Sequence, residues 1–283
     1  MNSKERISKI LNFQIPDRIG IHDQFLDTTV ENWKADGFPD DTRPENYFDL
    51  DIDIVKLEDA LVDNLLPDRE DRFRVLSFSE PFQRLCNVFG REEILRRLAR
   101  YPKELKASLI NETYSLLGSI KKVLESGAPF DGAWAWGDMA YSKGLFFSPS
   151  WYKEELFPIH KKIFRSLSSK GLFVFFHSEG NIVDIMPSLV DAGVRALHPL
   201  EEEGGMDIAG LMKEYRKDMV FIGHLNIAKM IRQNNFIDIL RYSVGLLKDN
   251  CSYIYSASYP IMPEISFGNY KMAIEALRSA GAY

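Results

Sequence analysis

Apolar positions along the chain form short runs that alternate with longer periodic segments. The short runs are rich in branched and aromatic side chains, which predicts strands. They cover residues 18–25, 51–57, 73–78, 131–136, 172–176, 194–197, 219–222 and 252–255. The run at 172–176, LFVFF, is apolar throughout and lies between a helical pattern and a turn signal. This predicts a strand buried on both faces, as in parallel sheets.

The longer segments place apolar residues three and four positions apart, which predicts helices. These segments are residues 3–13, 28–37, 91–100, 102–126, 148–169, 182–192, 207–216, 236–247 and 269–280. Ser148 and Pro149 supply a cap and a first-turn proline to one of them. Residues 61–72 are polar, contain Pro67 and show no period, which predicts a loop.

Alternation of eight predicted strands with helices is typical of an α/β protein with a parallel sheet. Eight units in 283 residues predict a (β/α)8 TIM barrel, with parallel strands and surrounding helices, as a single domain over 1–283. The alternative is a doubly wound open sheet. No Gly-x-Gly-x-x-Gly follows any of the predicted strands, so nothing in the sequence supports nucleotide binding by that alternative.

Charge and cysteine content narrow the class of protein. The net charge of -6 argues against a nucleic-acid or anionic-membrane surface. No apolar run approaches membrane-spanning length, and the amino terminus has no signal-peptide core. Cys86 and Cys251 permit at most one disulfide and suit a reducing compartment. A cytoplasmic location is therefore expected.

Four of the five histidines fall at the carboxyl ends of predicted strands. They are His22, His177, His198 and His224, whereas His160 lies in the helix that begins at Pro149. A single histidine at a strand end more often satisfies a backbone group than binds a ligand. Four on strands that share one barrel mouth favour a common polar pocket.

Several carboxylates would lie at the rim of the same mouth. They are Asp23, Asp138, Glu179, Glu201 and Glu202. In the segment EEEGG, Glu202 and Glu203 have a simpler interpretation as a solvated run. The segment His177-x-Glu179 stands out, because residues i and i+2 at an extended strand end point the same way.

Several blocks of sequence, in a fixed order, resemble one family. They are FSPSWYKEELFPIHKKIFRSL, the motif G-x-x-x-x-x-H-S-E-G-N, DAGVRALHPLE, GGMDIAGL and FIGHLNI, with KERISKILNFQIPDRI, FSEPF, GDM and ISFGNYKMAIEAL elsewhere. Together they resemble the uroporphyrinogen decarboxylase superfamily, which includes corrinoid-dependent methyltransferases that act on coenzyme M or methoxylated compounds. The resemblance covers most of the chain and implies a TIM barrel, in agreement with the strand count.

The decarboxylase branch of this family acts on a porphyrinogen with eight carboxylates and uses an arginine-rich amino-terminal motif and a nearby aspartate, without a metal. This chain has Arg18 but no arginine cluster in that region. An acidic rim with a lone arginine is poorly matched to a polyanionic substrate. The resemblance therefore favours the other branch.

The methyltransferase branch carries a zinc motif, His-x-Cys with a distant second cysteine, that binds and deprotonates a thiol. His177 matches the histidine, but Glu179 replaces the first cysteine, and Ser258 or Tyr259 stands near the second. Zinc also accepts a carboxylate oxygen, so His177 and Glu179 are candidate ligands, with Asp138 or Ser258 as the third. The alternative is a polar pair that caps the next helix through Gly180 and Asn181.

We expect a methyltransferase that moves a methyl group between a corrinoid (cobalamin) and a small acceptor. The expected cofactors are zinc and a corrinoid carried by a partner protein, and a homodimer is implied by the family. Asp138, His177 and Glu179 are the candidate catalytic residues. The candidate substrate contacts are His22, Asp23, Trp136, His198, Glu201, His224, Asn226 and Tyr259. The alternatives are uroporphyrinogen decarboxylation and a non-catalytic barrel that binds a tetrapyrrole or a corrinoid protein.

Overall fold

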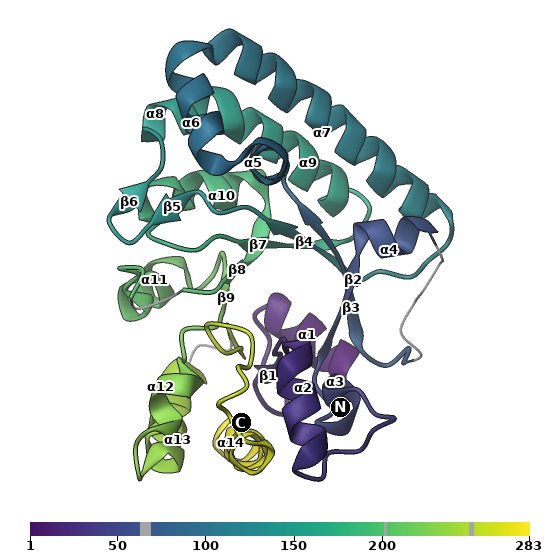
Figure 1. Ribbon diagram of the computed structural model, residues 1–283, viewed down its shortest axis with the longest axis vertical. Helices are drawn as coiled ribbons and strands as arrows, with labels where there is room; N and C mark the ends of the chain where they lie inside the picture. The colour runs from purple at the N-terminus through teal and green to yellow at the C-terminus, as the bar shows by residue number, and fades with distance from the viewer. Residues whose placement is uncertain (63–68, 201–202, 249–251) are drawn as a thin grey trace.

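The computed structural model describes residues 1–62, 69–200, 203–248 and 252–283. Eight strands form one sheet in the order β1-β10-β9-β8-β7-β4-β3-β2, and each neighbouring pair is parallel. The strands are β1 (Gly20–Ile21), β2 (Ile52–Lys56), β3 (Phe73–Ser79), β4 (Gly132–Trp136), β7 (Phe173–His177), β8 (Val194–His198), β9 (Val220–Ile222) and β10 (Tyr253–Tyr255). The sheet curves into a nearly closed barrel (Figure 1), which confirms the predicted (β/α)8 architecture.

The barrel is bridged between β1 and β2 by one aspartate. The backbone N–H of Asp51 donates to the carbonyl of Ile21, and the N–H of Ile21 donates to the Asp51 carboxylate at 2.8 Å. Arg6 and Arg18 each donate to this buried carboxylate at 2.7 Å. Two guanidinium groups thus compensate the cost of burying the charge.

Apolar side chains fill the barrel interior, and α1 (Ser3–Leu11) closes its amino-terminal end. Ile7, Ile10 and Leu11 of α1 belong to the same buried cluster as the inward side chains of the strands. At Gly20 a Cβ atom would lie 2.6 Å from Cδ1 of Ile7, so a larger residue would force the Ile7 side chain to shift. Because this end is plugged, a ligand can enter only at the carboxyl end of the strands.

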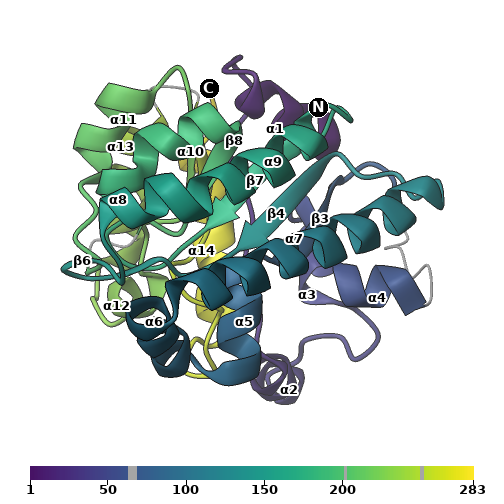
Figure 2. The same cartoon turned by 90° about the horizontal axis from the view of Figure 1, so that it is seen from above.

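Helices surround the sheet, and a larger apolar cluster lies between the two layers. They are α2 (Asp27–Ala35), α3 (Pro44–Tyr47), α4 (Leu57–Val62), α5 (Pro81–Phe89), α6 (Arg91–Arg100), α7 (Pro102–Glu125), α8 (Pro149–Trp151), α9 (Phe157–Ser168), α10 (Met186–Ala192), α11 (Ile208–Tyr215), α12 (Ile227–Ile231), α13 (Phe236–Lys248) and α14 (Phe267–Ala280). A π-helical turn, Tyr152–Leu156, joins α8 to α9, and a 3-10 turn at Val183–Ile185 precedes α10. Helix α9 packs on β7, and α7 packs on α9 and α5 (Figure 2).

Three local predictions differ from the structure. Residues 61–72, predicted as a loop, begin inside α4, and residues 63–68 lie outside the described ranges. Helices α3, α4, α5 and α12 were not predicted, because α3, α4 and α12 each span fewer than two turns and α5 has only nine residues. Of the predicted strand at 18–25, only Gly20 and Ile21 form β1. On one side of β1, the N–H of Ile21 donates to the Asp51 carboxylate and not to the backbone of a neighbouring strand.

Candidate functional site

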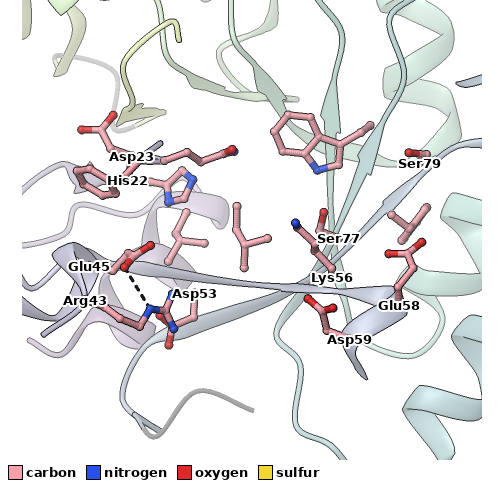
Figure 3. Close-up of a pocket in the computed structure, with 16 residues that line it drawn as sticks. His22, Asp23, Arg43, Glu45, Asp53, Lys56, Glu58, Asp59, Ser77 and Ser79 are labelled. Carbon is pink, nitrogen blue, oxygen red and sulfur yellow. Dashed lines mark ion pairs between the residues drawn. The ribbon is translucent and has the colours of Figure 1, made fainter. Parts of the chain in front are cut away.

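The carboxyl ends of the strands surround two adjoining cavities of about 490 and 180 Å3. The larger cavity lies over β1, β2 and β3 (Figure 3), and the smaller one lies over β4, β7, β8 and β10. Gln24 and Trp136 line both cavities. Catalysis in barrels of this kind takes place at this end, so the two cavities are the candidate active site.

Strand register brings an indole and two imidazoles side by side in the smaller cavity. Trp136 is paired with His177, and His177 is paired with His198, on three neighbouring strands. The ring centroids of Trp136 and His177 lie 4.0 Å apart. Nδ1 of His177 lies 2.7 Å from Nδ1 of His198, a hydrogen bond in which one nitrogen carries the proton and the other accepts it. The two imidazoles therefore share a proton.

Asp138 completes this arrangement from the loop after β4. Its Oδ1 lies 3.6 Å from Nε2 of His177, and its Oδ2 accepts a hydrogen bond from Arg91 at 2.9 Å. Burial acts to raise the pKa of Asp138, but the hydrogen bond and charge of His177, the N–H of Glu179 and the Arg91 guanidinium outweigh it and lower the pKa to about 2. Asp138 is thus ionised at neutral pH and faces Nε2 of His177.

His198 lies deeper than His177. Burial lowers the pKa of His198 well below its usual value, and the neighbouring charges of His177 and His22 act in the same direction. His198 is therefore neutral when His177 carries the extra proton. The chain Arg91, Asp138, His177 and His198 can accept or release one proton at the wall of the cavity.

His22 forms part of the larger cavity from the end of β1. Its side chain is 3% exposed, and neither ring nitrogen has a hydrogen-bond partner of normal geometry, although the backbone of Ile52 lies close by. Burial lowers the pKa of His22 to about 4. The ring is tilted against Trp134 at a centroid distance of 5.4 Å, so it is neutral and packed.

Asp23 is buried next to His22 and joins the end of β1 to β10 and α14. Its carboxylate accepts hydrogen bonds from the Ala257 N–H and the Tyr270 hydroxyl, both at 2.7 Å. Burial outweighs these bonds and raises the pKa of Asp23 to about 7. With both oxygens engaged, Asp23 supports the wall of the cavity.

A buried polar network supports the loop that carries Asp138. Glu80 caps α5, its N–H donates to the carbonyl of Trp136, and its carboxylate lies 3.1 Å from Nε2 of His160. The Tyr152 hydroxyl lies 3.0 Å from the other nitrogen of His160. This network links the end of β3 to the end of β4. His160, the histidine that lies away from the barrel mouth, therefore has a structural role in this network.

Comparison with known proteins agrees with this architecture. The sequence profile of the uroporphyrinogen decarboxylase family (URO-D) matches residues 62–280. The chain belongs to the uroporphyrinogen decarboxylase family. A methyltransferase from Methanosarcina mazei has a similar structure, with a TM-score of 0.72 and 14% sequence identity over 99% of this chain and 98% of that one. At this identity the likeness concerns the fold. No curated protein matches the chain.

Not all predicted site residues of this URO-D family member share one pocket. His22 and Asp23 line the larger cavity, and His177, Glu179, His198, Ser258 and Tyr259 line the smaller one. His224 and Asn226 follow β9 but line another cavity of about 530 Å3 beside α11, α12 and α13, which shares Ser258 with the smaller cavity. Glu201 lies outside the described residues.

The separation of His224 from the other histidines has a backbone cause. His224 adopts a positive φ of 74°, and its Nδ1 lies 3.2 Å from the carbonyl oxygen of Leu200. The turned backbone and this contact hold the ring away from the His177 and His198 pair. Position after a strand does not reveal such a local turn.

Polar residues of β2 and β3 were missed by the sequence analysis. Lys56, Ser77 and Ser79 line the larger cavity, together with Gln24 from the segment after β1. A signal was present in the sequence, because Lys56 is in phase with Ile52 and Ile54 along an alternating strand. A charged residue at an inward position near the carboxyl end of a barrel strand is a candidate ligand contact.

The described residues do not form a ready zinc site. Within 1–62, 69–200, 203–248 and 252–283, no group of three or more His, Cys, Asp or Glu side chains is placed to hold a metal ion. Nδ1 of His177 is bonded to His198, and its Nε2 faces Asp138. A metal on His177 would have to replace one of these contacts.

None of the described helices combines the length and apolar character that a membrane crossing needs.

Proposed function

We propose that this URO-D family protein is an enzyme that transfers a methyl group between a corrinoid, carried by a partner protein, and a small molecule bound in the barrel mouth. The observation that carries the proposal is the hydrogen-bonded pair of His177 and His198, backed by Asp138, at the wall of an open cavity. The family membership and the shared fold with a methyltransferase support it.

Methyl transfer to or from oxygen or sulfur requires movement of one proton. When a methyl ether is the donor, the carbon–oxygen bond breaks and the oxygen needs a proton; when a thiol is the acceptor, the sulfur must lose one. The corrinoid supplies or accepts the methyl group. In the first direction the pair of His177 and His198 gives one proton to the oxygen, and in the second direction it receives one proton from the sulfur.

Asp138 and Arg91 have positioning roles in this scheme. Asp138 faces Nε2 of His177, and Arg91 holds the carboxylate in place. Trp136 packs against the His177 ring and fixes its orientation. Glu179 and Tyr259 are exposed at the rim of the same cavity, where the partner protein would approach.

The decarboxylase alternative is less well supported by the charges at the site. A porphyrinogen with eight carboxylates needs several cations, but the larger cavity is lined by two basic residues, Arg43 and Lys56, and Arg43 lies 3.3 Å from Glu45. Each carboxylate that is buried without a partner costs on the order of several kcal/mol. A small substrate with one negative charge matches the site better.

The function is tested with free cobalamin in place of the partner protein. Purified protein is mixed with cob(I)alamin and 3-methoxybenzoate, and separately with methylcobalamin and 2-mercaptoethanesulfonate, and the absorbance change between the two cobalamin forms is followed. We expect a rate above the protein-free background in one direction and its loss in His177→Ala. No rate in either direction, or conversion of uroporphyrinogen to coproporphyrinogen by the same preparation, would overturn the proposal.

A further inference from the structure

Lys56 is the cation of the larger cavity that has no carboxylate partner among the described residues. It occupies the last position of β2, on the same face as Ile52 and Ile54, which pack in the barrel interior. Its register partner on β3 is Ser77. Figure 3 shows both side chains at the wall of the cavity. In the described ranges, no carboxylate oxygen lies within 4.0 Å of the Lys56 ammonium.

The carboxylates deeper in this cavity are already compensated. Asp53 is buried and lies 3.1 Å from the Arg72 guanidinium. Glu45 lies 3.3 Å from Arg43. Burial raises the pKa of Asp23 to about 7, so much of its charge is absent at neutral pH.

The remaining acidic residues lie at the rim. Glu58 and Asp59 are exposed at the start of α4, outside the strand that carries Lys56. Lys56 is exposed as well, so solvent screens the effect of all three charges on a bound ligand. At the mouth of the cavity, Lys56 is therefore the lining cation without a carboxylate partner among the described residues.

Four side chains at the cavity wall have buried hydrogen-bonding atoms without a hydrogen-bond partner in the described structure: His22, Trp136, and one carboxylate oxygen each of Glu45 and Asp53. Both ring nitrogens of His22 and the indole N–H of Trp136 are buried without a partner of normal geometry in the described structure. Figure 3 shows the His22 ring directed into the cavity. Leaving such a group unpaired is unfavourable, and a hydrogen bond to an oxygen atom of a bound molecule removes this cost.

We propose that the larger cavity binds the carboxylate of a small, singly charged substrate through the Lys56 ammonium and the Ser77 hydroxyl. The rest of the substrate extends past Trp136, which lines both cavities, toward the pair of His177 and His198. The orientation toward these histidines rests on the proposed function. The carboxylate subsite itself rests on the charges and donors of the cavity.

The subsite is tested by calorimetric binding without turnover. The probes are 3-methoxybenzoate and the neutral 3-methoxybenzamide, which differ in the carboxylate. Lys56→Met removes the charge at similar length, Lys56→Arg keeps it, and Lys103→Met is the matched control, because Lys103 is an exposed lysine on α7. We expect the Kd for the benzoate to rise at least tenfold in Lys56→Met, to change little in Lys103→Met, and to be partly restored in Lys56→Arg.

A second measurement reports the position of the ligand. The chain has four tryptophans, so the indole N–H signals are few in a nitrogen-15 NMR spectrum. The Trp136 signal, assigned with Trp136→Phe, should shift on addition of the benzoate and not of the amide. Equal affinity of wild type for both probes, an unchanged Kd in Lys56→Met, or no binding of the benzoate by wild type would each overturn the subsite.

These outcomes are separable from those for methyl transfer. Lys56-dependent binding without any methyl transfer would leave the subsite in place and refute the proposed function. Methyl transfer from the benzoate with a Kd that is independent of Lys56 would support the proposed function and refute the carboxylate subsite.

Discussion

Replacing Asp23 by asparagine should change how the stability of the protein depends on pH. Asp23 is buried, and its pKa is raised from 3.8 to about 7 because burial disfavours the charged form. A raised pKa means that the folded state holds a proton that the unfolded state has released. The stabilisation is therefore complete below pH 3.8 and is lost as the pH rises through 7.

The size of the effect follows from this difference in pKa. Each pKa unit corresponds to about 1.36 kcal/mol, so a change of about three units gives on the order of 4 kcal/mol. The asparagine in the Asp23→Asn variant does not titrate, and its side-chain amide can keep a hydrogen bond with the Ala257 N–H. The free energy of unfolding of wild type minus that of Asp23→Asn should thus fall by this order between pH 4 and pH 8.

Urea unfolding followed by circular dichroism at several pH values measures this difference. His22, whose pKa is lowered to about 4 by burial, makes the opposite contribution, which is lost as the pH falls from 6.5 to 4, but it is present in both proteins and cancels. Tyr270→Phe removes a hydrogen bond to the Asp23 carboxylate and should move the fall to higher pH. A difference that is constant from pH 4 to 8, or that rises with pH, would refute the reasoning.

Three further predictions concern the histidines. His198→Asn should lower the rate of methyl transfer by about 10²–10⁴, with little change in Kd for the substrate, because one member of the proton-sharing pair is lost; an unchanged rate and pH profile would contradict a role in proton transfer. His160→Ala should lower the free energy of unfolding, measured with urea, by about 2–4 kcal/mol, because Glu80 loses its buried partner and a cavity forms. A decrease of less than about 0.5 kcal/mol would show that the network does not stabilise the fold. Because both nitrogens of His177 are engaged, we expect equal, low zinc content in wild type and His177→Ala after dialysis against zinc, whereas zinc retained by wild type alone would establish the site predicted from the sequence.

The order of the eight strands, and the end of the barrel at which the candidate site residues lie, were determined by the sequence alone. Hydrophobic runs of strand length between amphipathic segments leave few arrangements other than a parallel β/α barrel in one sheet. Polar residues that directly follow such runs must lie at the carboxyl end of the sheet. His22, His177 and His198 were therefore predicted at the barrel mouth without any knowledge of their contacts.

Contacts between strands were decided by the tertiary structure. The register of β7 against β8 brings Nδ1 of His177 to Nδ1 of His198, and a shift by one residue would place one ring on the opposite face. A turn with positive φ removes His224 from the same pocket. The charge state of Asp23 likewise depends on burial by distant segments, which local sequence does not encode. Pairing, register and burial arise from residues far apart in the chain, so only the folded structure determines which predicted residues share a site.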